Sequence, residues 1–270
     1  MSTEGKSNEQ TAPSGPFVRL RLLVAYDGSS FRGFAYQSAT LPTVARELRR
    51  AMAPMWGYEP ELTVAGRTDA GVHAWGQVVS VDIPEAAAIR FDCERIRKSL
   101  NNQLSNAVVV REVSQVVGDF GARFSATGRT YKYTVDMAAT PSPFDRHLVW
   151  HVGEDLDVAA MNEACDAIIG EHDFTSFCKR PEDLPDGSPR SLVRRVTQAR
   201  WEQQGSRAVF EVSANAFCHQ QVRSLVGMLV AIGRGRRAVS DMAKAIDAKD
   251  RSAIVSPAPP EGLCLWEVQY

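Results

Sequence analysis

The sequence predicts an α+β protein made of two lobes, each built on an antiparallel sheet. The chain has 270 residues, more than the roughly 100–200 residues of a typical single domain. Between residues 18 and 117 the strand and helix patterns follow one another as β-α-β-β-α-β, which is the split βαβ, ferredoxin-like (RRM-like) arrangement. The second half repeats this order without repeating the sequence. We therefore expect a disordered tail at 1–16, an N-terminal lobe at 17–118 and a C-terminal lobe at 119–270.

The overall composition is that of an ordinary globular chain. Hydrophobic residues make up 44% and charged residues 23% of the sequence, which excludes a collagen-like, coiled-coil or largely disordered protein. The 31 basic and 32 acidic residues nearly cancel, so a nucleic-acid partner would have to meet a local basic face. No apolar run has the roughly 18–20 residues of a membrane helix. Residues 1–16 lack an apolar core and match neither a secretory signal nor a transit peptide.

The N-terminal lobe begins with a strand at 18–25, where Val and Leu recur in alternation, and Asp27-Gly28 ends it with a turn. Thr43 is placed as the N-cap of a helix, because apolar residues at 44, 48, 52 and 55 follow at helical spacing. A short strand is expected at 62–65 and, after a glycine-bounded loop, a longer alternating strand at 77–83. A second helix at 90–103 and a strand at 108–117 complete the lobe.

The C-terminal lobe opens with a predicted strand at 131–135. Asp157 is expected to cap a helix with apolar residues at 161, 165, 168 and 169, and Gly170 is expected to end it. Strands at 196–201 and 208–212 predict a hairpin around 203–206. A long apolar helix at 217–232, a short helix at 240–248 and a strand at 263–268 follow.

The segment 66–73 (GRTDAGVH), which we call the signature loop, has the highest density of reactive groups in the chain. Its two glycines can adopt backbone angles that other residues avoid, and between them lie a cation, a hydroxyl and a carboxylate. The predicted strands on both sides would hold these groups on a rigid base, as many functional loops are held. On composition alone, a tight hairpin in which Asp69 bonds to its own backbone is the commoner arrangement. The Asp27-Gly28-Ser29 segment likewise favours a simple turn.

The cysteines and histidines do not predict a metal site. The five cysteines include no C-x-x-C pair, and their odd number and scatter favour a reducing, cytosolic compartment. His73, His172 and His219 lack the spacing of metal ligands, so a structural or surface role is expected for each. The sequence has no P-loop, G-x-G-x-x-G or G-x-S-x-G motif, which leaves no anchor for nucleotide hydrolysis, dinucleotide redox or serine-hydrolase chemistry.

Two further features carry charge in unusual places. Arg223 lies within the apolar helix predicted at 217–232, where an arginine is costly to bury unless a carboxylate pairs with it. It either extends to the surface beside His219 or supplies the counter-charge to a functional carboxylate, for which Asp69 is our candidate. Residues 122–133 interleave three cations with three aromatic rings, a pattern compatible both with RNA contact and with an amphipathic strand. Further basic clusters together suggest a segregated positive surface; they are Arg46/Arg49/Arg50, Arg95/Arg97/Lys98, Arg194/Arg195 and Arg234/Arg236/Arg237.

Six motifs of the chain resemble those of the bacterial tRNA pseudouridine synthase A family, in the family's order and over residues 19–270. The strongest match is AGRTDAGVHAWGQVV at 65–79. The others are YDGS at 26–29, ARFSATGRTYKY at 122–133, GEHDFTSF at 170–177, ANAFCHQQVRSLVGML at 214–229, and AKDRS followed by EGLCL near the C-terminus.

The resemblance implies isomerisation of uridine to pseudouridine at positions 38, 39 and 40 in the anticodon stem-loop of tRNA. It further implies two ferredoxin-like lobes around a basic central cleft, a cytoplasmic homodimer, and no cofactor or metal. Asp69 matches the family's essential aspartate, Tyr131 the tyrosine that stacks on the target base, and Arg223 the basic residue that pairs with the aspartate. Arg67 matches an arginine implicated in extruding the nucleotide. The apolar lining of the pocket corresponds to one of two residues, Leu263 and Leu265.

Four departures from the family's pattern lie outside these positions. They are the GFAYQ run at 33–37, Ala45 in place of a common glutamine, Gly121 in place of a frequent histidine, and LSNA at 104–107. These departures bear on RNA contacts and on the choice of target uridines. A non-catalytic tRNA-binding or tRNA-folding protein on the same fold is the alternative. A carboxylate-dependent glycosidase is a third reading, but the signature loop offers no second acid for it.

Overall fold

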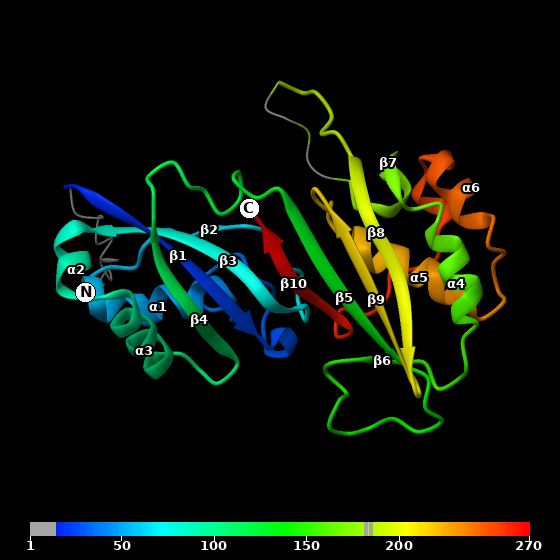
Figure 1. The fold of residues 1–270 in the computed structure, drawn as a ribbon, viewed down its shortest axis with the longest axis horizontal. Coiled ribbons are helices and arrows are strands. Elements are labelled where there is room, and N and C mark those ends of the chain that lie inside the picture. Colours follow the sequence, from blue (N-terminus) through cyan, green and yellow to red (C-terminus); the bar gives the residue numbers. More distant parts are fainter. Residues whose placement is uncertain (1–14, 181–182, 184–185) are drawn as a thin grey trace, which may run out of the picture.

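The structure is a computed structural model that describes residues 15–180, 183 and 186–270. Within these ranges ten strands join in one sheet, in the order β4-β1-β3-β10-β5-β9-β8-β7, with β2 paired to β3 and β6 to β5 (Figure 1). The sheet is mostly antiparallel, the parallel pairs being β10 with β3 and β5 with β6. The predicted α+β class is therefore confirmed. Residues 1–14 of the predicted tail lie outside the described residues.

The strands are β1 (Phe17–Tyr26), β2 (Thr63–Val64), β3 (His73–Pro84), β4 (Val108–Val116), β5 (Gly128–Asp136), β6 (Trp150–His151), β7 (Gly170–Asp173), β8 (Val193–Gln204), β9 (Arg207–Ala214) and β10 (Leu263–Gln269). The helices are α1 (Val44–Trp56), α2 (Glu85–Arg90), α3 (Cys93–Gln103), α4 (Val158–Cys165), α5 (Gln221–Gly233) and α6 (Asp241–Ala248). Short 3-10 turns are η1 (Gly28–Ser30), η2 (Thr175–Phe177) and η3 (Arg251–Ala253). The sequence patterns predicted every strand except β6 and β7.

The two halves of the sheet share one internal order. Neighbouring strands run β4-β1-β3-β2 in the N-terminal half and β10-β5-β9-β8 in the C-terminal half. The last strand, β10, joins the halves (Figure 1): it pairs antiparallel with β5 and, through Cys264 and Leu265, in parallel with β3. The beginning of β3, directly after the signature loop, is thereby brought close to β5.

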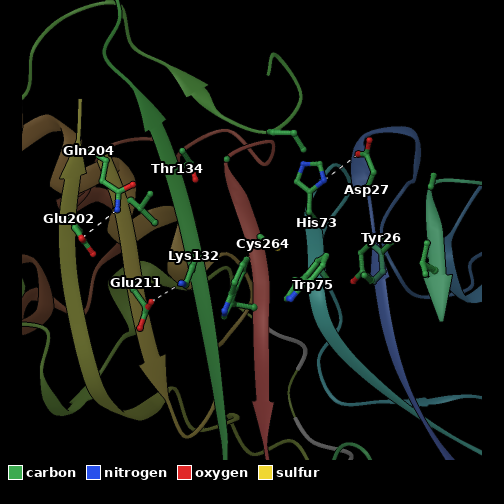
Figure 2. A pocket seen from close by; sticks show the side chains of 18 of the residues that line it. Tyr26, Asp27, His73, Trp75, Lys132, Thr134, Glu202, Gln204, Glu211 and Cys264 are labelled. Carbon is green, nitrogen blue, oxygen red and sulfur yellow. Dashed lines mark hydrogen bonds and ion pairs between the residues drawn. The ribbon is translucent and has the colours of Figure 1, made fainter. Parts of the chain in front are cut away.

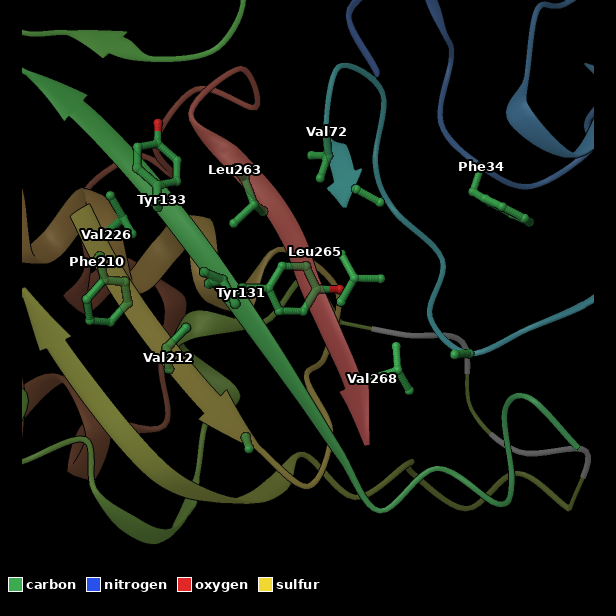
Figure 3. Packing of buried hydrophobic residues seen from close by; sticks show 14 of the residues in the cluster. Phe34, Val72, Tyr131, Tyr133, Phe210, Val212, Val226, Leu263, Leu265 and Val268 are labelled. Carbon is green, nitrogen blue, oxygen red and sulfur yellow. The ribbon is translucent and has the colours of Figure 1, made fainter. Parts of the chain in front are cut away.

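Alternate strand residues form the core beneath the helices. In β1, Leu22 and Val24 are fully buried, and the N-cap predicted at Thr43 is confirmed because its hydroxyl accepts a hydrogen bond from the backbone of α1. In the C-terminal half, Phe210 of β9 packs with Val226 of the apolar helix α5 (Figure 3). This period of two along the strands places every second side chain on the helix-covered side.

Three of the predicted helices begin or end at other residues in the structure, each for a local reason. The helix predicted at 90–103 begins only at Cys93, because Asp92 has an extended backbone and its carboxylate caps α3, while Arg90 is the last residue of the preceding helix α2. The helix predicted from 217 begins at Gln221, because Gln220 adopts a left-handed conformation (φ +67°). The helix expected to reach Gly170 ends at Cys165, and Gly170 instead opens β7. In the described part of the chain, none of the helices is long and apolar enough to cross a membrane.

Candidate active site

The signature loop leaves β2, turns over the sheet and enters β3. At the turn, the backbone N–H of Val72 donates to the carbonyl of Asp69 (3.2 Å), and Gly71 adopts the left-handed conformation (φ +79°) that suits glycine. The N–H of Phe34 donates to the carbonyl of Thr68 (3.1 Å) and fixes the loop from the side. Among the described residues, the carboxylate of Asp69 bonds to side chains of the C-terminal half and not to its own loop. The self-capped hairpin is therefore not formed.

A buried polar network supports the loop. The hydroxyls of Tyr26 and Thr68 lie 2.7 Å apart, and Nε2 of Gln77 donates to the carbonyl of Gly66 (2.7 Å) and to the hydroxyl of Tyr26 (3.3 Å). Burial raises the pKa of Tyr26, so its phenol stays neutral and can both donate and accept. Because leaving these polar groups buried and unpaired would be costly, the network fixes the position of the loop relative to the sheet.

Asp69 faces Arg223, which lies in the first turn of α5. Nη1 of Arg223 is 3.3 Å from Oδ2 of Asp69, and its Nε donates to the carbonyl of Ala258 (2.7 Å). The other carboxylate oxygen, Oδ1, lies 3.2 Å from Nε2 of His219. The side chain of Arg223 is only 16% exposed, so it does not extend into bulk solvent, whereas that of Asp69 keeps 26% of its surface exposed. The carboxylate of Asp69 is therefore partly open to solvent.

Tyr131 of β5 lies close to the same carboxylate. Its ring is largely buried and packs edge-on against Phe217, with ring centroids 5.2 Å apart. Burial raises the pKa of Tyr131, and the negative charge of Asp69 raises it further, so the phenol is neutral. Leu265 of β10 pairs with Tyr131 across the sheet, and Leu263, the neighbour on the same side of the strand, is buried as well (Figure 3).

Arg129 ties the segments around the site together. It donates to the carbonyls of Ala65, Arg123, Ala126 and Asn215, which belong to three separate stretches of the chain. Burial lowers the pKa of this guanidinium below its ordinary value. Arg129 thus joins the start of the signature loop to the segment that leads into α5.

Arg67 within the signature loop and Arg123 outside it are both exposed cations. Arg67 is exposed and has no hydrogen-bond or ion-pair partner in the part of the chain that the structure describes. The guanidinium of Arg123 lies over the ring of Phe124, 5.4 Å from its centroid, and that ring is 84% exposed. Lys132, in contrast, pairs with Glu211 (3.1 Å). The segment 122–133 is therefore an amphipathic strand preceded by an exposed cation and ring.

Three of the four further basic clusters are partly neutralised. Their ion pairs include Arg50 with Glu47, Arg97 with Glu94, and Arg234 with Glu154. Exposed pairs of this kind contribute little to stability, but they reduce the net positive charge of each cluster. The segregated positive surface suggested by the sequence stays a prediction.

A separate hollow of about 700 Å³ lies on the sheet face that Lys132 and Cys264 share, and its lining includes neither Asp69 nor Tyr131 (Figure 2). On this face Trp75 and Trp266 stack with ring centroids 6.0 Å apart, and both are more than a third exposed. Successive side chains of a strand point to opposite faces, which separates Lys132 from Tyr131. The hollow is therefore not part of the site around Asp69.

The cysteines hold one unexpected feature. Cys178 and Cys218 form a disulfide with Cα atoms 5.7 Å apart, while Cys93, Cys165 and Cys264 are free. The partners are 40 residues apart in sequence, so their spacing did not predict the bond. The number and scatter of the cysteines had instead predicted free thiols in a reducing compartment. Among the described residues, no group of three or more His, Cys, Asp or Glu is placed to hold a metal ion.

His219 is the site residue that the sequence reasoning missed. Its spacing predicted a structural or surface role, yet its imidazole touches the carboxylate of Asp69. The chain gave no local signal for this contact, because His219 precedes α5 and the left-handed Gln220 separates it from the helix that carries Arg223. His73 and His172 do make structural contacts: Nδ1 of His73 accepts from the N–H of Gly28 (3.0 Å), and Nε2 of His172 lies 3.0 Å from a backbone carbonyl.

Comparison with known proteins gives three findings. A family model described as tRNA pseudouridine synthase matches residues 164–270. The chain is similar to proteins named tRNA pseudouridine synthase A from Anoxybacillus flavithermus (38% identity; 93% of this chain, 98% of the relative), Streptomyces griseus (39%; 97% and 91%) and Acidiphilium cryptum (40%; 93% and 96%). Among solved structures, a chain of a Cbf5–Nop10–Gar1 complex is similar with a TM-score of 0.32 and 14% identity, covering 78% of this chain and 45% of that one. A likeness this distant bears on neither the fold nor the site.

Proposed function

This chain belongs to the tRNA pseudouridine synthase A family and is an isomerase that forms pseudouridine in tRNA; from that premise we propose that it acts at positions 38, 39 and 40 of the anticodon stem-loop, with Asp69 as the catalytic nucleophile or base. The single observation that carries the proposal is the partly exposed carboxylate of Asp69 held against Arg223. An ionised carboxylate is required for either role, and the guanidinium supplies its counter-charge.

The reaction rearranges bonds within one nucleotide. The glycosidic bond from N1 to the sugar breaks, the uracil turns, and its C5 bonds to the same sugar carbon. The proton on C5 is released and N1 gains one, so the atoms balance without an oxidant or a phosphate donor. The base is out of reach while it is stacked, and it must first be flipped out at a cost of about a few kcal/mol. We assign Arg67, the exposed cation of the signature loop, to the extrusion of the nucleotide.

The flipped uracil needs a surface on which to turn. We assign Tyr131 to stacking on the base. Its aromatic ring is neutral and lies close enough to Asp69 for the charge of the carboxylate to raise the pKa of the phenol. Leu263 and Leu265 supply the apolar wall that would keep water from the detached uracil. These roles require that the ring of Tyr131, now packed edge-on against Phe217, keeps one face available to the base.

We also propose that the two halves are ferredoxin-like lobes, 17–118 and 119–270, around a basic cleft that receives the tRNA. The shared strand orders β4-β1-β3-β2 and β10-β5-β9-β8 support this division. We propose the cytoplasm as the compartment, because the tRNA substrate is found there. The homodimer is proposed to use the sheet face that carries Trp75 (Figure 2), where the exposed rings of Trp75 and Trp266 stack on each other.

The oligomeric state tests the last of these points. Replacing both Trp75 and Trp266 by glutamate places two like charges on the proposed interface. In sedimentation experiments the parent should behave as a dimer and the double variant as a monomer. A monomeric parent, or a double variant that remains dimeric, would contradict the proposed interface.

The target positions are tested with purified protein and an unmodified tRNA transcript. Mass-spectrometric mapping should find pseudouridine at 38, 39 or 40 and nowhere else, and a transcript with cytidine at these three positions should remain unmodified. Modification elsewhere in the tRNA would contradict the proposed positions. Tight binding without any pseudouridine would favour the alternative, a non-catalytic tRNA-binding or tRNA-folding protein.

A further inference from the structure

We propose that His219 is a positioning residue: its Nε2–H donates to Oδ1 of Asp69 and fixes the plane of the carboxylate. The two oxygens of Asp69 then have separate donors, His219 on Oδ1 (3.2 Å) and Arg223 on Oδ2 (3.3 Å). With only one donor, the carboxylate can rotate about its Cβ–Cγ bond; with two, it presents one orientation to the substrate. This inference rests on the proposed catalytic role of Asp69.

The backbone beside His219 is held in an unusual conformation that aims its side chain. Gln220 adopts the left-handed region (φ +67°), which residues other than glycine, asparagine and aspartate rarely enter. Its side-chain oxygen accepts from Nη2 of Arg251 (2.7 Å), a contact that helps to keep the residue there. Such conformations persist only where the surroundings impose them, and they concentrate at functional sites.

The segment is also anchored on its other side. The backbone N–H of Lys179 donates to the carbonyl of His219 (2.9 Å), and the N–H of Cys218 donates to the side-chain oxygen of Gln221 (2.9 Å). The disulfide from Cys218 to Cys178 binds the same segment to the residue that follows η2. Three hydrogen bonds and the disulfide therefore hold residues 218–221 in place, which distinguishes His219 from a histidine on a free surface loop.

A simple exposed ion pair is the competing explanation, because the side chain of His219 is 49% exposed and pairs of that kind are worth little. The two explanations differ in what they require of the side chain. A positioning role needs one N–H donor at the place of Nε2. Glutamine can supply such a donor, since its Nε2 is the same number of bonds from Cα; asparagine falls one bond short, and phenylalanine has no donor.

The experiment compares His219→Gln, His219→Asn and His219→Phe in steady-state release of tritium from C5 of uridine in tRNA. We expect the Asn and Phe variants to lose about tenfold or more in kcat, as for a hydrogen bond to a charged group, and the Gln variant to retain most of it. KM and the tRNA dissociation constant should stay close to those of the parent. His172→Asn, a change at a histidine outside the site, serves as the control and should match the parent.

Two outcomes would overturn the inference. One is parental kcat in His219→Phe. The other is an equal loss in the Gln and Asn variants with a raised KM, which would indicate a direct contact with RNA. Asp69→Asn, measured in parallel, distinguishes a failure of the proposed catalytic role of Asp69 from a failure of the positioning role of His219. If Asp69→Asn keeps its turnover, the proposed catalytic role fails; if it is inactive while His219→Phe is fully active, only the positioning role fails. Thermal unfolding of each variant identifies any that fails to fold.

Discussion

Arg223 contacts a carboxylate that lies 154 residues earlier in the chain: its Nη1 is 3.3 Å from Oδ2 of Asp69. The two residues come from different halves of the molecule, Asp69 from the loop between β2 and β3 and Arg223 from α5. The halves meet at β10, which pairs with both β3 and β5. The last strand of the chain therefore connects the half that carries Asp69 to the half that carries Arg223.

Replacing Arg223 by alanine should lower kcat by about 10- to 100-fold, because losing a hydrogen bond to a charged group costs about 1.5–3 kcal/mol. Lysine keeps the charge but lacks the fork that bonds to Asp69 and to the carbonyl of Ala258 together, so its kcat should lie between those of alanine and the parent. Tritium-release kinetics check both values. Equal kcat in all three proteins would show that the ion pair has no catalytic part.

Removing the hydroxyl of Tyr26 should destabilise the protein by about 1–3 kcal/mol, since Thr68 and Gln77 each lose a buried partner. Urea denaturation of Tyr26→Phe measures this change in the free energy of unfolding. Tyr58→Phe is the matched control, because this buried tyrosine has no hydrogen-bonded hydroxyl among the described residues. If both variants unfold at the same urea concentration, the network does not support the loop.

Gly28→Ala should damage the signature loop from outside it. A Cβ atom at Gly28 would lie 2.0 Å from the backbone carbonyl oxygen of Val72, so one of the two segments must shift. Crowding of this kind typically costs about 1–3 kcal/mol of stability, so the melting temperature should fall. Because the displaced loop carries Asp69, we also expect a loss of turnover at temperatures where the variant is still folded. Gly118→Ala, where a Cβ meets nothing within 4 Å, should leave both unchanged. Parental activity in Gly28→Ala would mean that the loop tolerates displacement.

The thiol of Cys264 should titrate only at high pH. Burial raises its pKa to about 11, whereas an unfolded thiol titrates near pH 8.5. Because the folded pKa is the higher one, the stabilising contribution of the neutral thiol is complete below about pH 8.5 and is lost as the pH rises towards 11. Iodoacetamide labelling of Cys264, followed by mass spectrometry between pH 7 and 11, should show this late rise in the native protein and an early rise in urea. A native midpoint near 8.5 would contradict the buried, neutral thiol.

Local patterns predicted much of the fold, because alternation and helical spacing are properties of short segments. They located the helix caps at Thr43 and Asp157, the hairpin of β8 and β9, and the loop that carries Asp69. They did not reveal that β10 lies between β3 and β5, since that pairing depends on residues far apart in the chain. The same limit concealed the disulfide between Cys178 and Cys218.

The residues of the site likewise include some that local patterns predict and some that they do not. Charge on an apolar helix pointed to Arg223, because a buried guanidinium needs a partner. The contact of His219 with Asp69 was not predictable, because it depends on the left-handed backbone of Gln220, and glutamine gives no local sign of that conformation.

The most direct test of the account is tritium release from C5 of uridine in tRNA by Asp69→Asn. The change replaces a carboxylate by an amide of nearly the same shape, so it removes the charge while preserving the fold. We predict no release above background, with tRNA binding within about twofold of the parent because phosphate contacts dominate affinity. Turnover near that of the parent would contradict the central claim that the carboxylate of Asp69 carries the reaction.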